Sequence, residues 1–238
     1  EDSPWSSASI DTRRIVAGEL FIALRGPNFD GADFLGVAAA AGAAGTVAER
    51  AGPAGLPVIL VPDALVALQR AAAACRARYT GTVIGVAGSN GKTTVTQMIA
   101  SILQADKSQA SLSTQGNLNN DIGVPLTLLR LREHHRVAVL ELGMNHPGEI
   151  AQLAAIGQPT VALVNNAQRE HMEFMASVEA VARENAAVFE ALPANGTAVV
   201  NADDAYADYF REAAGAHRIV DFGLEQPAAI SGGYVLKN

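Results

Sequence analysis

From residue 83 onward, short apolar runs alternate with helical segments. The apolar runs that predict strands are Val83–Ala87, Val137–Glu141, Thr160–Val164, Gly196–Asn201 and Arg218–Asp221. The intervening segments that predict helices are Lys92–Leu103, Gly148–Ile156, Ser177–Leu192 and Ala205–Ala214. Apolar strands separated by helices are typical of a parallel sheet that is buried on both faces. Right-handed crossovers place the loops that follow the strands at one edge of such a sheet, where ligands bind.

Residues 1–81 have a different pattern and predict a smaller α/β unit. Its predicted elements are buried strands at Glu19–Leu24 and Pro57–Val61 and helices at Phe34–Ala44 and Ala64–Tyr79. Asp63 precedes the second helix as a suitable N-cap. We therefore expect two domains, residues 1–81 and 82–238. The second is expected to be incomplete, because the chain stops just after a glycine-rich turn while the sheet is still being built.

Composition restricts the class of function. Acidic residues outnumber basic ones by 24 to 17, and the net charge of −7 argues against a protein that mainly binds a nucleic-acid backbone. Cys75 is the only cysteine, so no internal disulfide can form, and a reducing, cytoplasmic compartment is expected. Its place in an alanine-rich helical run predicts a small buried residue. No apolar run is long enough to predict a membrane span, and no signal peptide is visible.

The strongest single motif lies between the first predicted strand of the larger unit and the helix after it. Glycines at 88 and 91 allow a tight turn whose N–H groups converge on an oxyanion, at the positive end of the helix. Lys92 can reach the β- and γ-phosphates, and Thr93 is placed to hold Mg²⁺. Val86 stands where the generic phosphate loop has glycine, so a simple glycine-rich turn is the alternative. The predicted nucleotide-binding residues are Gly88, Ser89, Asn90, Gly91, Lys92, Thr93 and Thr94.

A carboxylate ends the second predicted strand of this sheet. Val137, Val139 and Glu141 share one face by the two-residue period of a strand, and Glu141 is the last of them. A carboxylate at the ligand-bearing edge, near Thr93, suits Mg²⁺ that is shared with phosphate oxygens. The alternative is an exposed charge at a strand end.

Three blocks of sequence resemble the Mur ligase family. Residues 88–94 resemble its phosphate loop, residues 116–125 (GNLNNDIGVP) the block after its second strand, and residues 141–146 (ELGMNH) a strand end with a metal-binding glutamate. The 116–125 block is characteristic of the member that adds D-alanyl-D-alanine. Residues 11–13, 18–24 and 29–31 resemble the family's uridine-nucleotide substrate domain, so the resemblance covers essentially the whole chain.

This resemblance implies an ATP- and Mg²⁺-dependent ligase of peptidoglycan synthesis. It would join D-alanyl-D-alanine to UDP-N-acetylmuramoyl tripeptide through an acyl phosphate, without nucleic-acid or membrane partners. The sequence leaves the oligomeric state and the third residue of the acceptor peptide open, and a monomer is expected. The implied catalytic residues are Lys92, Glu141 and His171, and the implied metal ligands are Thr93, Glu141 and His171. The implied substrate-binding residues are Thr12, Arg13, Asn117, Asn119, Asn120 and Arg169.

Several of these residues also have plainer explanations. Asparagine-rich segments favour turns, and a loop histidine or arginine is often only solvated. Many family members carry a carbamylated lysine where this chain has Asn185. We expect either the neutral amide of Asn185 to act there, or Glu184 or a bound anion to compensate. Family members also have a third, C-terminal domain, so the chain alone is expected to show little or no ligase activity.

Three other functions have partly overlapping sequence requirements. A ligase that adds glutamate to folate shares the phosphate loop but is disfavoured by the 116–125 block and the N-terminal blocks. A binding module that holds a nucleotide or UDP-sugar peptide without turnover remains open for the isolated chain. A regulatory GTPase would need an Asn-Lys-x-Asp run to recognise guanine, and the sequence has none.

Overall fold

The computed structural model describes residues 5–53, 55–106, 110–169 and 175–233, which form two parallel sheets. The smaller sheet has four strands in the order β1-β2-β3-β4. They span Ala8–Ser9 (β1), Leu20–Ile22 (β2), Gly45–Ala48 (β3) and Val58–Leu60 (β4). A 3₁₀ turn at Gly31–Phe34 (η1) leads into helix α1 at Leu35–Ala40, and helix α2 at Ala64–Arg78 follows β4. The Asp63 side chain caps α2 by accepting from Val66 N, as predicted.

The larger sheet has seven strands in the order β11-β10-β9-β8-β5-β7-β6, and every neighbouring pair is parallel. The strands from β5 to β7 span Thr82–Ala87 (β5), Ser111–Ser113 (β6) and Val137–Glu141 (β7). The remaining strands span Val161–Val164 (β8), Thr197–Asn201 (β9), Arg218–Gly223 (β10) and Ile230–Ser231 (β11). The predicted parallel α/β architecture is confirmed.

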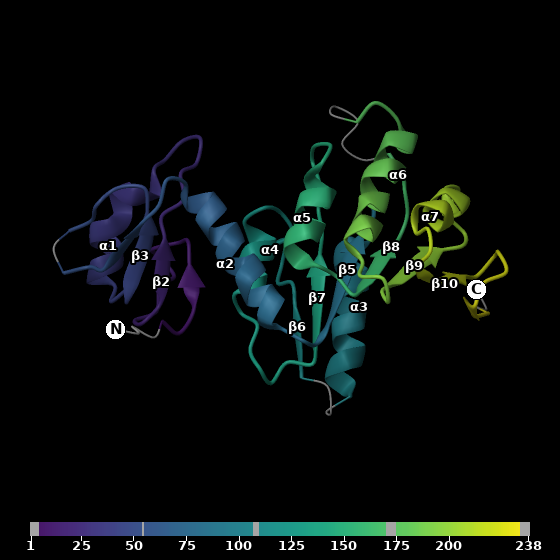
Figure 1. Ribbon diagram of the computed structural model, residues 1–238, viewed down its shortest axis with the longest axis horizontal. Coiled ribbons are helices and arrows are strands. Elements are labelled where there is room, and N and C mark those ends of the chain that lie inside the picture. Colours follow the sequence, from purple (N-terminus) through teal and green to yellow (C-terminus); the bar gives the residue numbers. More distant parts are fainter. Residues whose placement is uncertain (1–4, 54, 107–109, 170–174, 234–238) are drawn as a thin grey trace, which may run out of the picture.

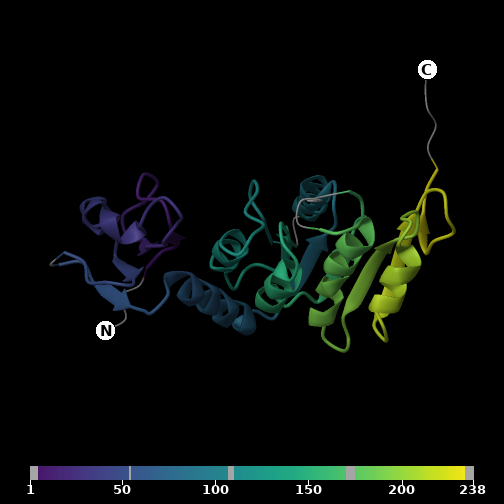
Figure 2. The same cartoon turned by 90° about the horizontal axis from the view of Figure 1, so that it is seen from above.

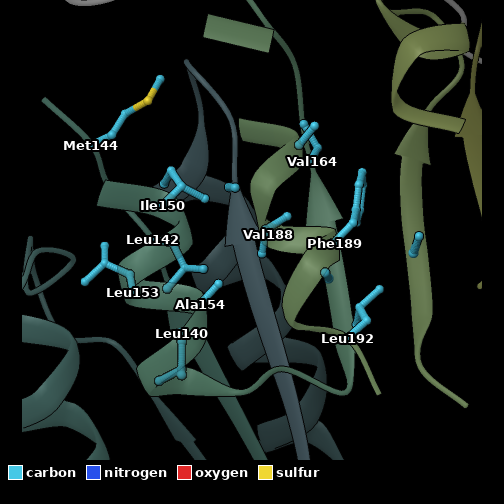
Figure 3. Packing of buried hydrophobic residues seen from close by; sticks show 14 of the residues in the cluster. Leu140, Leu142, Met144, Ile150, Leu153, Ala154, Val164, Val188, Phe189 and Leu192 are labelled. Atoms are coloured by element: carbon cyan, nitrogen blue, oxygen red, sulfur yellow. The ribbon is translucent and has the colours of Figure 1, made fainter. Parts of the chain in front are cut away.

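Helices cover both faces of the larger sheet. They span Lys92–Ala105 (α3), Gly123–Leu128 (α4), Glu149–Gly157 (α5), Val178–Ala186 (α6) and Ala207–Ala213 (α7), and a 3₁₀ segment, Ala187–Ala191 (η2), continues α6. Figure 2 shows α3 on one face and α5 and α6 on the other. On the α5 face, Leu140 of β7 and Leu142 just after this strand pack with Ile150 and Leu153 of α5 and with Phe189 of η2 (Figure 3). All five are at most 1 % exposed, so the strands that bear the ligand edge are held rigidly.

Helix α2 connects the two sheets (Figure 1). The smaller sheet buries Phe21 on the α1 face and Leu20 and Ile22 on the α2 face, as the two-residue period of a strand requires. Leu126 of α4 also packs against the α2-side cluster, and α4 is one of the helices that contact the larger sheet. The smaller sheet therefore packs against the rest of the protein through α2 and α4. Within the described residues, no helix is long and apolar enough to cross a membrane.

Some details of the predicted elements are wrong. The strand at Pro57–Val61 is an edge strand rather than a buried one, with Ile59 52 % and Leu60 62 % exposed. Helix α1 ends at Ala40 instead of continuing to Ala44, because Gly42 turns the chain with a φ of 83°. The predicted helix Ser177–Leu192 tightens to 3₁₀ geometry at Ala187. Cys75 lies in α2 as expected but is only half-buried. The predicted domain boundary at residue 81 stays a prediction.

Candidate functional site

The candidate site lies where the strand order of the larger sheet reverses. The chain leaves β5 for β6 and β7 on one side and then builds β8, β9 and β10 on the other. In open α/β sheets this switch point opens a crevice at the carboxyl ends of the strands, where ligands bind. Val86 of β5 pairs with Glu141, the last residue of β7, and Ala87 pairs with Val164, the last residue of β8. Three strand ends therefore meet at one point.

Two glycines shape residues 88–91, the loop between β5 and α3, which is hereafter the phosphate loop. Gly88 has a φ of 133° and Gly91, the N-cap of α3, a φ of 78°, conformations that residues with a Cβ rarely adopt. A Cβ at Gly88 would also lie 3.1 Å from the backbone N atoms of Asn165 and Asn166. Both glycines are therefore required by the turn itself. The residues predicted to bind nucleotide all lie in this loop or in the first turn of α3.

The turn after β8 holds the outer side of the phosphate loop. Asn165 Nδ2 and Asn166 Nδ2 donate to Asn90 O at 2.7 and 3.0 Å, and Asn90 N donates to Asn166 Oδ1 at 2.9 Å. Ser89 Oγ accepts from Gln168 N at 2.9 Å. Asn165, Asn166 and Gln168 were not among the predicted site residues. Their position directly after a predicted strand, at the ligand-bearing edge, is the signal that would have found them.

The start of α3 presents donors to the crevice. Its N-cap, Gly91, has no side chain to cap the helix, and a helical hydrogen bond runs from Val95 N to Gly91 O. The N–H groups of the first turn and the positive end of the helix therefore point towards the loop. Lys92 Nζ lies over the same loop, where it donates to Gly88 O at 2.6 Å and to Ser89 O at 2.9 Å. This cradle of N–H groups and one ammonium is suited to a phosphate.

Glu141 is the buried centre of the site, with 2 % of its surface exposed. Its Oε1 accepts from Thr93 Oγ1 at 3.0 Å and from Asn119 Nδ2 at 2.8 Å. Its backbone N donates to Thr114 Oγ1 at 3.0 Å. Its Oε2 is buried and has no hydrogen-bond partner among the residues that the structure describes. An ionised oxygen in that position is costly unless a cation lies beside it, so the alternative of an exposed strand-end charge is wrong.

Asn185 supports the loop from below. It is fully buried in α6, and its Oδ1 accepts from Gly88 N at 2.9 Å, while its Nδ2 has no partner among the described side chains and backbone groups. The neighbouring Glu184 faces another element, because its carboxylate accepts from Gly148 N at 2.8 Å and from Ile150 N at 2.9 Å, at the start of α5. Adjacent residues of α6 thus bind two different structures, and only Asn185 reaches the phosphate loop.

The predicted substrate-binding residues are not all brought together. Asn119 lies at Glu141, but Asn120 Oδ1 accepts from Gly123 N at 2.8 Å, at the start of α4. Asn117 is exposed on the same loop, and Arg169 is exposed just after Gln168. His171 lies outside the described residues, so its predicted metal-binding role is untested. Among the residues that the structure describes, no three His, Cys, Asp or Glu side chains form a metal-binding group.

Thr12 and Arg13 lie in the segment between β1 and β2 of the smaller sheet, whereas the phosphate loop follows β5 of the larger one. Arg13 is exposed and donates from Nε and Nη2 to the Asp11 carboxylate at 2.8 and 2.7 Å. Neither residue lines the apolar hollow of about 320 Å³ that lies between this sheet and α2. The side chains around that hollow include Trp5, Leu20, Ile22, Leu68 and Arg132.

Comparisons with known proteins agree with this geometry. Residues 6–76 match the model of the Mur ligase family catalytic domain, and residues 86–237 match that of the Mur ligase middle domain. The UDP-N-acetylmuramoyl-tripeptide–D-alanyl-D-alanine ligase of Escherichia coli K12 is 42 % identical over 203 residues, which cover 85 % of this chain and 44 % of that protein.

Two solved structures are also similar. A crystal structure of MurF from Acinetobacter baumannii aligns with a TM-score of 0.88 and 34 % identity over 95 % of this chain and 49 % of that one. MurF from Thermotoga maritima in complex with ADP aligns with a TM-score of 0.79 and 28 % identity over 95 % of this chain and 52 % of that one. The chain spans about half the length of the relatives that it matches. It belongs to the Mur ligase family.

Proposed function

We propose that this chain forms the nucleotide- and substrate-binding half of a ligase that adds D-alanyl-D-alanine to UDP-N-acetylmuramoyl tripeptide with hydrolysis of ATP. The observation that carries the proposal is the buried Glu141 carboxylate beside the phosphate loop. One of its oxygens is hydrogen-bonded to Thr93 and Asn119, and the other has no partner within the described part of the chain. The names of the similar proteins support the choice of substrates. The ADP complex of the Thermotoga maritima neighbour supports the choice of nucleotide.

The residues around Glu141 fit a magnesium ion. A carboxylate oxygen without a partner and the hydroxyl of Thr93 are the hard oxygen ligands that Mg²⁺ prefers. We assign Thr93 and Glu141 to this ion, and His171 stays a predicted ligand of a second one. When bound here, Mg²⁺ supplies positive charge to the oxygens of the triphosphate. Asn119, as a donor to Oε1, fixes the orientation of the carboxylate.

The chain's own groups position the reactants. In the proposed reaction, a carboxylate oxygen of the tripeptide attacks the γ-phosphorus of ATP, ADP leaves, and an acyl phosphate forms. The amine of D-alanyl-D-alanine then attacks the acyl carbon, loses a proton, and phosphate leaves. The first-turn N–H groups of α3 and the Lys92 ammonium lie where they can stabilise phosphoryl charge during the first step. Asn117 and Arg169 are exposed beside the site and are proposed to orient the peptide.

Asn185 takes a different part from the carbamylated lysine that many family members have in its place. We propose that its amide acts as a neutral support, because Oδ1 accepts from Gly88 N–H and so fixes the first turn of the phosphate loop. Glu184 is a poor substitute for the missing negative charge, since both its oxygens cap α5. This support needs no charge on residue 185.

Calorimetric titration of this chain tests the proposed substrate. UDP-N-acetylmuramoyl tripeptide should bind, and UDP-N-acetylmuramoyl monopeptide and a folate should bind at least tenfold more weakly. Tighter binding of the folate would favour a folate-type ligase, and equal binding of the two muramoyl peptides would contradict the tripeptide assignment. An Arg13→Ala variant measured beside an Arg183→Ala control would show whether the segment before β2 contributes to recognition.

A further inference from the structure

A second, strongly basic groove lies at the opposite edge of the larger sheet from the phosphate loop. Its volume is about 1060 Å³, and it runs between the end of α2 and the loop before β7. Thr82, the first residue of β5, lines it, whereas the phosphate loop follows the last residue of β5. A strand of this length spans roughly 17 Å, so one ligand group cannot occupy both sites.

The charged side chains that line the groove are mostly positive. Arg78, Arg132 and Arg136 line it, and Glu133 is the one acidic side chain in its described lining. None of the three arginines forms an ion pair with a described residue. This concentration of positive charge is unusual in a chain with a net charge of −7. Proximity to the negative end of α2 accounts for Arg78, but Arg132 and Arg136 lie on the loop before β7.

The structure itself holds part of this charge in place. Arg132 donates to three carbonyl oxygens, Leu129 O at 2.9 Å, Leu131 O at 2.8 Å and Ser6 O at 2.8 Å. Carbonyl oxygens satisfy its donors without neutralising its charge, so the guanidinium is fixed while its positive field remains. Arg78 and Arg136 are exposed, and their side chains make no hydrogen bond to a described residue. The groove therefore combines one fixed cation with two that can reach a ligand.

Two histidines add donors at the same place. The rings of His134 and His135 lie with centroids 4.2 Å apart. His135 Nδ1 accepts from Arg132 N at 3.0 Å, which leaves the ring proton on Nε2 as a donor. Burial, together with the positive charges of His134, Arg132 and Arg130, lowers the pKa of His135. A bound anion would offset that positive field.

We propose that this groove is a second binding site, for a small molecule that carries a diphosphate group. Guanidinium groups bind phosphate oxygens through paired N–H donors, and several of them around one groove match a multiply charged anion better than a single carboxylate. The site would operate independently of the phosphate loop, because it lies at the other edge of the sheet. Its ligand is either free diphosphate or the diphosphate of a nucleotide.

The test follows the ring proton resonances of His134 and His135 by NMR, assigned with His134→Gln and His135→Gln variants. Inorganic pyrophosphate and ADP are titrated separately, without magnesium, into the chain with Lys92→Ala, which weakens the phosphate loop. Saturable shifts with both probes mean that the groove binds the diphosphate group itself. Shifts with ADP alone mean that the nucleoside is also required for binding. No saturable shift with either probe overturns the proposal.

Matched variants locate the binding. Arg78→Ala combined with Arg136→Ala should weaken the binding at least tenfold, and 0.5 M salt should weaken it in the unsubstituted groove. Arg218→Ala, the loss of an equally exposed arginine at the start of β10, should change it less than twofold. Equal weakening by both sets of substitutions would overturn the proposal, because it would reflect net charge alone. Thermal melting of each variant confirms that the fold is retained.

Discussion

The two sheets of this protein present their candidate ligand groups in different ways. At the larger sheet, Thr93, Asn119 and Glu141 come from three distant parts of the chain and are joined by hydrogen bonds around one buried carboxylate. At the smaller sheet, Arg13 stays exposed and pairs with Asp11, two residues away. The first arrangement is fixed by the packing of strands and helices, and the second depends on one surface segment. The proposed nucleotide site is therefore preorganised, and the proposed substrate contacts of the smaller sheet are less so.

The largest loss of stability is expected in α2, the helix that connects the two sheets. Arg76 of α2 is 7 % exposed, and it donates to Gly157 O at 2.8 Å, Gln158 O at 2.6 Å and Tyr79 O at 2.9 Å. Arg76→Ala would leave these carbonyl oxygens without a partner and lower the free energy of unfolding by about 2–4 kcal/mol. Chemical denaturation measures the loss. Arg78→Ala, two residues along the same helix but exposed, should cost less than about 0.5 kcal/mol.

A smaller loss of stability is expected from substitution of Asn185, which accepts a hydrogen bond from the phosphate loop. Asn185→Ala removes the acceptor of Gly88 N–H and leaves that buried donor unsatisfied, which costs about 1–3 kcal/mol. We expect nucleotide affinity to fall about tenfold as the loop loses its anchor. Calorimetry with ATP measures this, and Glu184→Gln serves as the control because Glu184 binds α5 instead. The reverse pattern would show that the charge of Glu184, and not the amide of Asn185, supports the nucleotide.

Substitution of Gly143 tests whether the position of the Glu141 carboxylate matters for binding, because Gly143 is not itself a proposed ligand. A Cβ there would lie 2.7 to 2.9 Å from the side-chain atoms of Asn119, the group that orients Glu141. Because the tip of Asn119 can move, Gly143→Ala should leave the fold intact but weaken magnesium-dependent ATP binding by roughly fivefold to tenfold. Gly36→Ala is the control, since a Cβ at Gly36 would meet nothing within 4 Å. Unchanged ATP binding in Gly143→Ala would mean that Asn119 does not position the carboxylate.

The smallest effect is expected at the smaller sheet. The hydrogen bonds from Arg13, first from its side chain and then from its backbone, lower the pKa of Asp11 from 3.8 to about 2. Because the folded pKa is depressed, this stabilisation is present above pH 3.8 and is lost as the pH falls through about 2. Arg13→Ala should raise the Asp11 pKa towards 3.8, seen by NMR titration of the carboxyl carbon. Stability at pH 7 should change little, because water screens an ion pair as exposed as this one.

The contrast between the sheets also explains what could be predicted from sequence. The strands and helices around the phosphate loop were found because each one follows a clear apolar period, and Glu141 because it ends such a strand. β3 and β6 were missed because Gly45–Ala48 and Ser111–Ser113 are short and carry few large apolar residues. The hydrogen bond between Asn185 and Gly88 could not be predicted from the sequence either. It depends on how α6 packs beneath a loop 97 residues earlier, which no local pattern encodes.

The claim that Glu141 is the centre of a magnesium–nucleotide site is tested most directly by calorimetric titration of ATP, with and without Mg²⁺. The unsubstituted chain is compared with Glu141→Gln, which keeps the shape and removes the charge. Mg²⁺ should tighten ATP binding to the unsubstituted chain. Glu141→Gln should lose most of that gain and bind ATP without Mg²⁺ about equally well. An equal gain in ATP affinity from Mg²⁺ in both chains, or no binding of ATP to the unsubstituted chain, would contradict the claim that Glu141 is the centre of this site.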